Sequence, residues 1–177
     1  MSTIIDDAAT ASLTTPRPPR LGEIVYRFTG RLGEMNPVGL FDDGIRFFNH
    51  FEGAIVDGPF AGGKISGPDF FVLRPTGIGE IHAPELIEFG AHRVALDVRG
   101  YLIGPEGLTV PPLEVVLQPG FEFPDAEFRV TATAHAATAS LEFGHLNAAV
   151  IVVEGFVNMG TGAIDVTARI VDAAGDV

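Results

Sequence analysis

The sequence predicts an all-β protein that folds as a single antiparallel β-barrel, an up-and-down meander of hairpins. Several stretches alternate apolar and polar residues, which is the pattern of a strand with one buried face. The clearest examples are residues 24–32 (IVYRFTGRL) and 164–170 (IDVTARI). The chain also contains 22 glycines and 13 prolines, which leave little room for a long helix. Consecutive hairpins explain both observations.

The expected strands follow one another at short spacing along the chain. They are 22–33, 45–57, 60–66, 69–74, 78–83, 91–104, 112–118, 126–135, 147–158 and 163–172. Clusters rich in Gly and Pro, such as 57–59 and 160–162, separate several of them and are typical of turns. One short helical turn has room at 37–43 or at 84–89. We expect the last two strands to close the meander.

Length and composition indicate one folded domain with a short arm before it. A chain of 177 residues with 46% hydrophobic residues can bury a core, but it is short for two domains. Residues 1–20 are small, polar and proline-rich, and they carry too little apolar surface to offset the entropy of ordering. We therefore expect a flexible N-terminal arm over 1–20 and a β-barrel domain over 21–177.

The charge of the chain argues against two classes of partner. The formal net charge is −12, which repels the phosphates of nucleic acids and anionic membrane surfaces, so we expect neither as a partner. The absence of cysteine excludes disulfides and thiolate catalysis. Asp6 and Asp7 stand where a signal peptide needs basic residues, which favours a cytoplasmic location.

Common catalytic and cofactor motifs are missing from the sequence. There is no dinucleotide or phosphate-binding glycine motif, no His-Glu-x-x-His and no Gly-x-Ser-x-Gly. The sole lysine, Lys64, supports Schiff-base chemistry only weakly. His50 and Glu52 lie two residues apart on one strand face, but the His-x-His of cupin-like metal sites is absent. We expect no cofactor and no metal.

Alternate residues of a strand form a row that faces one side of the sheet. A polar residue in a mostly apolar row is forced into the barrel and is a candidate site residue. Tyr26 and Asp69 both lie in such rows. His145 and Asn147 do so too if the register of the strand over 147–158 extends back to them. The row of His50 is about as polar as its neighbour, so its orientation stays ambiguous.

Each candidate also has a structural explanation. An inward Tyr or Asn is often a hydrogen-bonded core residue. Asp69 could cap the turn at Gly67 and Pro68, and His145 could face solvent or bond to backbone. The carboxylate of Asp69 is the hardest to explain in this way, because an ionised group in an apolar row is costly unless it is paired or protonated.

Two stretches carry a family resemblance. Residues 50–65 (HFEGAIVDGPFAGGKI), followed by 67–70 (GPDF), resemble the "G-x-F-x-G-P, G-x-V, G-G-A-D-W" series of the domain-of-unknown-function family 3237. Residues 143–147 (FGHLN) and the apolar strand after them are similar to the family's "W-L-N-R" stretch. The resemblance covers about residues 22–171. It implies a single antiparallel barrel similar to allene-oxide-cyclase and lipocalin-like barrels, and no settled activity.

The chain departs from this family at two places. Residues 81–85 read IHAPE where the family shows "L-D-A-R-Y", and residues 145–148 read HLNA where it shows "W-L-N-R". The resemblance carries over Asp69 and Asn147 by position, whereas His145 is particular to this chain. This suggests a specialised member whose substrate the family does not name.

Our first hypothesis for the function is a cofactor-independent enzyme that acts by proton transfer. Its substrate is a small apolar metabolite with a carbonyl or enol group, bound inside the barrel, and the reaction is an isomerisation, cyclisation, dehydration or retro-aldol cleavage. Asp69 or His145 is the expected general base and His50 the complementary acid. Tyr26 and Asn147 are the expected donors to a developing oxyanion. All five residues should then line one cavity.

Two alternatives remain open. A non-catalytic binding or carrier protein for a small apolar ligand needs the cavity but not the paired titratable groups. A barrel that acts through homo-oligomerisation needs neither.

Overall fold

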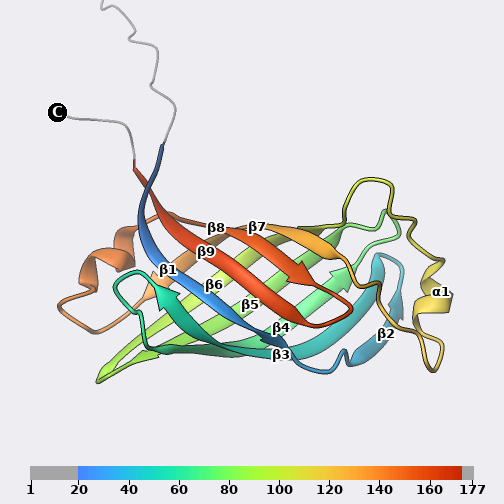
Figure 1. The fold of residues 1–177 in the computed structure, drawn as a ribbon, viewed down its shortest axis with the longest axis horizontal. Coiled ribbons are helices and arrows are strands. Elements are labelled where there is room, and N and C mark those ends of the chain that lie inside the picture. Colours follow the sequence, from blue (N-terminus) through green and yellow to red (C-terminus); the bar gives the residue numbers. More distant parts are fainter. Residues whose placement is uncertain (1–19, 173–177) are drawn as a thin grey trace, which may run out of the picture.

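The computed structural model describes residues 20–172, in which eight antiparallel strands close into a barrel and a further short strand pairs alongside (Figure 1). The strands are β1 (Arg20–Leu32), β2 (Pro37–Phe41), β3 (Gly44–Asp57), β4 (Lys64–Leu73), β5 (Gly79–Phe89), β6 (His92–Ile103), β7 (Glu127–Ala137), β8 (Ile151–Asn158) and β9 (Ala163–Asp172). Two short helices, α1 (Leu113–Val116) and the 3₁₀ helix η1 (Gly144–Ala148), lie in connections. The arm predicted over 1–20 lies outside the described residues, except for Arg20, which begins β1.

The strands form the predicted meander, and β1 closes it. Each strand from β3 to β8 pairs with the next one along the chain, and β1 pairs with β9 on one side and with β3 on the other. Phe28 shows the closure directly, because it faces Val166 in one ladder and Ile55 in the other. The predicted fold class is confirmed.

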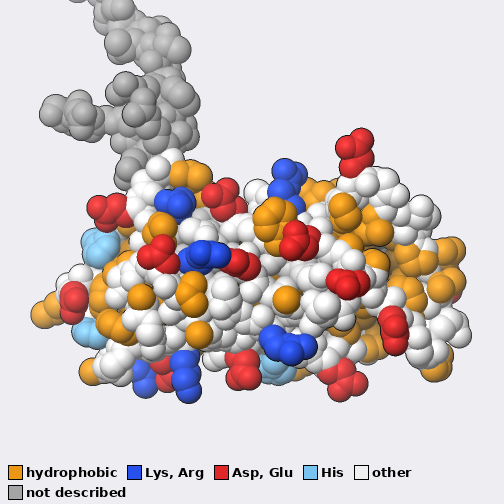
Figure 2. All heavy atoms as spheres, viewed as in Figure 1, with side chains coloured by type: hydrophobic (Ala, Val, Ile, Leu, Met, Phe, Trp, Pro, Cys, Tyr) orange, Lys and Arg blue, Asp and Glu red, His pale blue; other side chains and the backbone are white. Residues whose placement is uncertain are grey.

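Alternation along the strands separates the core from the outer wall. In β7 exposed and buried residues alternate from Glu127 to Ala134, and the buried ones pack into one continuous core with those of the other strands. Figure 2 shows charged side chains of both signs on the outer wall. One exposed ion pair joins Arg27 Nη2 to Asp165 Oδ2 at 2.8 Å. The period-two pattern therefore places each face as predicted.

Several of the predicted elements need correction. Residues 60–66 and 69–74 belong largely to one strand, β4, which continues through Gly67 and Pro68. Residues 112–118 contain α1 and form no strand. β6 pairs directly with β7, so the sheet leaves no place for a strand between them. The two prolines at 111–112 also have no N–H to donate to a sheet. The segments that had room for a helical turn, 37–43 and 84–89, lie mainly in β2 and β5.

The two ends of the barrel are closed in different ways. At the η1 end, Phe60 packs against Phe143 and Phe89, with ring centroids 4.4 Å and 6.1 Å away, and the first two rings are buried. At the other end lies the connection 104–126, which contains α1 and which we call the cap (Figure 1). Its aromatic residues pack onto the barrel, as in the edge contact of Phe123 with Phe47. No helix within residues 20–172 is long and apolar enough to cross a membrane.

Candidate functional site

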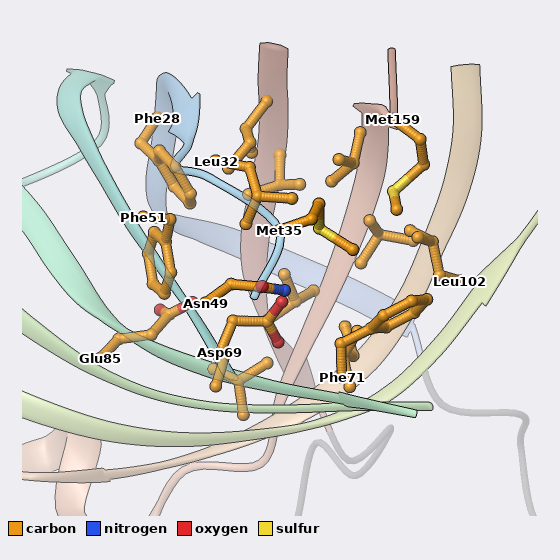
Figure 3. A pocket seen from close by; sticks show the side chains of 18 residues that line it. Phe28, Leu32, Met35, Asn49, Phe51, Asp69, Phe71, Glu85, Leu102 and Met159 are labelled. Atoms are coloured by element: carbon orange, nitrogen blue, oxygen red, sulfur yellow. The ribbon is translucent and has the colours of Figure 1, made fainter. Parts of the chain in front are cut away.

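Three polar side chains face an otherwise apolar cavity inside the barrel. The central cavity has a volume of about 70 Å³, and its polar lining residues are Asn49, Asp69 and Glu85 (Figure 3). At roughly 15 Å³ for each water-sized group, it holds about five such groups. Its remaining walls are aliphatic, aromatic and methionine side chains. The cavity therefore suits the reactive end of a small, largely apolar molecule.

Strand alternation places these three residues inside. Asn49 lies on β3 between the buried Phe47 and Phe51, and Asp69 lies on β4 two residues before the buried Phe71. Glu85 lies on β5 between the buried Ala83 and Ile87. Alternate residues of a strand face the same side, so turning one of them outward would also expose its apolar neighbours. The burial of these neighbours therefore keeps the three polar groups inside the barrel.

The backbone between β4 and β5 is unusual next to the carboxyl groups. Ser66 pairs with Leu86 and Phe70 with His82, but the ladder is interrupted between these pairs. The unchanged register sets Pro68 of β4 opposite Pro84 of β5, and neither has an N–H to donate. We call this stretch, 67–69 of β4 and 83–85 of β5, the proline seam. It carries Asp69 on one side and Glu85 on the other.

Close approach of the two backbones at the proline seam requires a glycine. A Cβ added to Gly67 would lie 2.0 Å from the carbonyl oxygen of Pro84, well inside van der Waals contact. Gly67 therefore lets the two strands stay together where the ladder lacks hydrogen bonds. This keeps the two carboxyl groups within electrostatic reach of each other.

Glu85 is buried and bonded to a buried tyrosine. Tyr26 Oη donates a hydrogen bond of 2.8 Å to Glu85 Oε2, and both residues are buried. Burial raises the pKa of Glu85 to about 8, the hydrogen bond from Tyr26 opposes the rise, and the negative charge of Asp69 adds to it. The pKa of Tyr26 is also raised, by burial first and then by the neighbouring Glu85.

Asp69 titrates at a lower pH than Glu85. Burial raises its pKa to about 6, while the amide of Asn49 and the imidazole of His82 favour the ionised form. Asn49 lies directly opposite Asp69 in the β3–β4 ladder. Its Oδ1 accepts a hydrogen bond of 3.1 Å from the backbone N–H of Asn36. Within residues 20–172, the buried atoms Asn49 Nδ2 and Asp69 Oδ1 have no hydrogen-bond partner.

The two pKa values separate the protonation states of the carboxyl groups at neutral pH. Asp69 is then mostly ionised and can accept a proton, whereas Glu85 is mostly protonated and can donate one. Because Oε2 of Glu85 accepts the bond from Tyr26, Oε1 is left to carry the proton. The arrangement thus sets a group that can accept a proton near one that can donate a proton, in a largely apolar cavity.

Two of the residues predicted for the site lie at the central cavity. Asp69 lines it, and Tyr26 reaches it through the bond to Glu85. His50 does not, since it lies exposed on the outer face of β3 with its ring 5.1 Å from that of Phe48.

The other two predicted residues lie on the surface at the η1 end. His145 and Asn147 are exposed in η1, because β8 begins only at Ile151 and its register does not extend back to them. Asn147 holds the backbone of Thr138 through two hydrogen bonds, with its Oδ1 accepting at 2.8 Å and its Nδ2 donating at 3.0 Å. The prediction that all five residues share one cavity is therefore wrong for His50, His145 and Asn147.

The structure also brings in two residues that sequence reasoning missed, Asn49 and Glu85. Asn49 shares its row with Phe47 and Phe51, so the same parity argument that found Asp69 could have found it. Glu85 lies in the same row as Ala83, but a proline at position 84 argues against a continuous strand, so the predicted strand ends at residue 83. Among the described residues, no three His, Cys, Asp or Glu side chains come together in a way that could hold a metal ion.

Comparison with known proteins places the fold. No protein-family model matches the sequence, and no curated protein matches it. A β-barrel-like protein from Acinetobacter baumannii is similar in structure, with 22% identity and a TM-score of 0.68 over 89% of this chain and 99% of that one. A conserved protein of unknown function from Rhodopseudomonas palustris has 18% identity and a TM-score of 0.66, over 88% and 99%.

A third similar structure belongs to an enzyme. This enzyme from Penicillium herquei has 14% identity and a TM-score of 0.58, over 90% of this chain and 98% of the other. At these identities the likeness establishes the fold alone. This chain is therefore a closed antiparallel β-barrel of a kind found in bacteria and in a fungus.

Proposed function

We propose that this protein is a cofactor-independent enzyme that transfers protons on a small, largely apolar molecule with a carbonyl or enol group. The observation that carries the proposal is the pair of carboxyl groups that line one cavity, the half-buried Asp69 and the buried Glu85, whose pKa values of about 6 and about 8 lie on either side of neutrality. An apolar cavity that shifts two acids apart in this way suits acid–base catalysis. The reaction class is an isomerisation, cyclisation, dehydration or retro-aldol cleavage.

Each polar group has a role in such a reaction. The carboxylate of Asp69 removes a proton from the carbon next to the carbonyl, and the electron pair of the broken C–H bond forms the enol double bond. The carbonyl oxygen then takes the proton of Glu85. Asn49 Nδ2 donates a hydrogen bond to the same oxygen as negative charge develops on it. Tyr26 orients Glu85 through its hydrogen bond.

Two further observations support the proposal. The sequence series that resembles the domain-of-unknown-function family 3237 includes Asp69, and we propose membership of this family. A barrel of similar fold belongs to a protein described as an enzyme. The alternative, a binding or carrier protein for a small apolar ligand, uses the same cavity without the chemistry.

Hydrogen exchange on a small ketone tests the proposal. Cyclopentanone in D₂O at neutral pD should exchange its α-hydrogens faster with the wild-type protein than in buffer alone, as followed by proton NMR. Asp69→Asn should slow the catalysed exchange by about 10²-fold, the usual scale for a lost general base. His50→Ala, on the outer face of β3, is the matched control and should exchange like the wild type.

Two results would contradict the proposal in different ways. Equal exchange by the wild type and Asp69→Asn would remove Asp69 from the reaction. Binding of the ketone without exchange above the buffer rate would favour the carrier.

A further inference from the structure

The cap covers a second hollow that is several times larger than the central cavity. This cap pocket has a volume of about 300 Å³ and lies between the cap and the end of the barrel. Its walls are mostly apolar, with Leu108, Val110, Val116 and Phe123 of the cap facing Phe128 of β7. Val116 is the buried residue of α1, so this short helix presents its apolar side to the pocket.

The cap pocket and the central cavity are neighbours that share three side chains. Phe71, Leu102 and Met159 line both hollows. In Figure 3 they lie across the cavity from Glu85. Leucine and methionine side chains change rotamer readily, and methionine adapts to irregular space. The part of the boundary formed by Leu102 and Met159 can therefore yield to a ligand, beside the packed ring of Phe71.

Polarity changes along the line that joins the two hollows. Asn49, Asp69 and Glu85 face the central cavity, while the polar side chains at the cap pocket, Thr109 and Glu122, are exposed and its buried lining residues are apolar. At the other end of the barrel, the buried rings of Phe60 and Phe143 fill the interior. Among residues 20–172, the cap pocket is thus the neighbouring apolar hollow into which a ligand too long for the central cavity can extend.

We propose that the cap pocket is the subsite for an apolar tail, and that the substrate is an elongated amphiphile. Its carbonyl or enol head lies between Asp69 and Glu85, and its hydrocarbon chain or ring passes Met159 and ends under α1. The orientation of the head rests on the proposed function, whereas the tail subsite rests on the shape and polarity of the two hollows. The central cavity alone is too small for such a molecule.

A series of 4-alkylphenols, from 4-methylphenol to 4-octylphenol, tests the subsite by isothermal titration calorimetry. The phenol hydroxyl imitates an enol and can donate to Asp69, and the alkyl chain probes the cap pocket. Affinity should rise about threefold to fourfold for each methylene that is buried, and should level off once the pocket is full. An affinity that does not change with chain length would overturn the proposal.

Two neighbouring residues of α1 provide a matched pair of variants. Val116 is 7% exposed and lines the cap pocket, whereas Val115 is 44% exposed on the outer side. Val116→Trp should abolish the gain with chain length and leave 4-methylphenol unchanged, while Val115→Trp should bind the whole series like the wild type. A gain that persists in Val116→Trp would show that the chain lies elsewhere. Val110→Phe fills the same pocket from another part of the cap, should Val116→Trp fail to fold.

The same series separates this inference from the proposed function. Asp69→Asn should weaken binding of every phenol by a similar factor and keep the gain with chain length. If that gain is kept while cyclopentanone exchange is absent, the tail subsite stands and catalysis does not. If exchange depends on Asp69 but the gain is absent, the reverse holds.

Discussion

Asn49 and Asp69 lie directly opposite each other in the β3–β4 ladder, and each presents a buried polar atom without a hydrogen-bond partner among the described residues. Leaving such a group unpaired costs about 1–3 kcal/mol. A ligand that accepts from Asn49 Nδ2 and donates to Asp69 Oδ1 would remove that cost for both atoms. A ligand group that both accepts and donates, such as a hydroxyl, therefore fits between these two side chains.

Asn49→Asp tests the role of the amide donor. The new carboxyl keeps an oxygen for the N–H of Asn36 and loses the donor that faces Asp69. We expect the pKa of Asp69 to rise above about 6, and catalysed cyclopentanone exchange to fall by about 10²-fold or more because the oxyanion loses its donor. The rate should be measured across pH by NMR. A rate like that of the wild type would remove Asn49 from the reaction.

A plot of the catalysed exchange rate against pH should be bell-shaped. Exchange should increase as Asp69 ionises near pH 6 and decrease as Glu85 loses its proton near pH 8. Because the two groups interact, the limbs report the titration of the pair. Glu85→Gln should remove the alkaline limb and leave the acidic one. A profile that keeps its alkaline limb in this variant would assign that limb to another group.

Stability should fall as pH rises. Both buried acids have raised pKa values, so the folded protein holds protons that the unfolded chain releases, and the stabilisation is complete only below the unfolded pKa. For Glu85 it is lost between pH 4.5 and about 8, and for Asp69 between 3.8 and about 6. At about 1.4 kcal/mol per pKa unit, these two windows correspond to a loss on the order of 5–8 kcal/mol.

Urea unfolding at several pH values between these limits measures this loss. Glu85→Gln keeps an acceptor for Tyr26 and should flatten the dependence above pH 6, where Asp69 is already ionised. Glu52→Gln, on the exposed face of β3, is the control and should leave the dependence unchanged. An equal slope in the wild type and Glu85→Gln would mean that Glu85 titrates normally.

Gly67→Ala should disrupt the proline seam. The added methyl group would meet the carbonyl oxygen of Pro84 at 2.0 Å, so β4 and β5 must separate. We expect a loss of about 1–3 kcal/mol, as for other overpacked sites, and a melting temperature lower by several degrees. Gly144→Ala is the matched control, because a Cβ there meets nothing within 4 Å. Similar melting temperatures for the two variants would contradict the close approach at the seam.

Alternation of side chains predicted most of this fold, because a strand with one buried face leaves its pattern in any sequence. The same argument placed Asp69 inside. It failed for Glu85, where Pro84 interrupts the pattern although β5 continues. It also failed for His145, because a 3₁₀ helix precedes β8 and resets which side each residue faces. Alternation predicts which way a side chain faces only within a strand. The ends of a strand depend on its pairing with segments that are distant in the sequence.

The packed rings of Phe60, Phe89 and Phe143 close the barrel at the η1 end. In the proposed binding mode, a molecule that enters past the cap leaves at the same end, with its polar head last. In the proposed reaction, product and fresh substrate therefore cannot follow each other through the interior, and each turnover would have to empty the barrel before the next begins. A long tail that tightens binding under α1 would then also delay departure, so that the most tightly held substrates need not be the fastest to be converted.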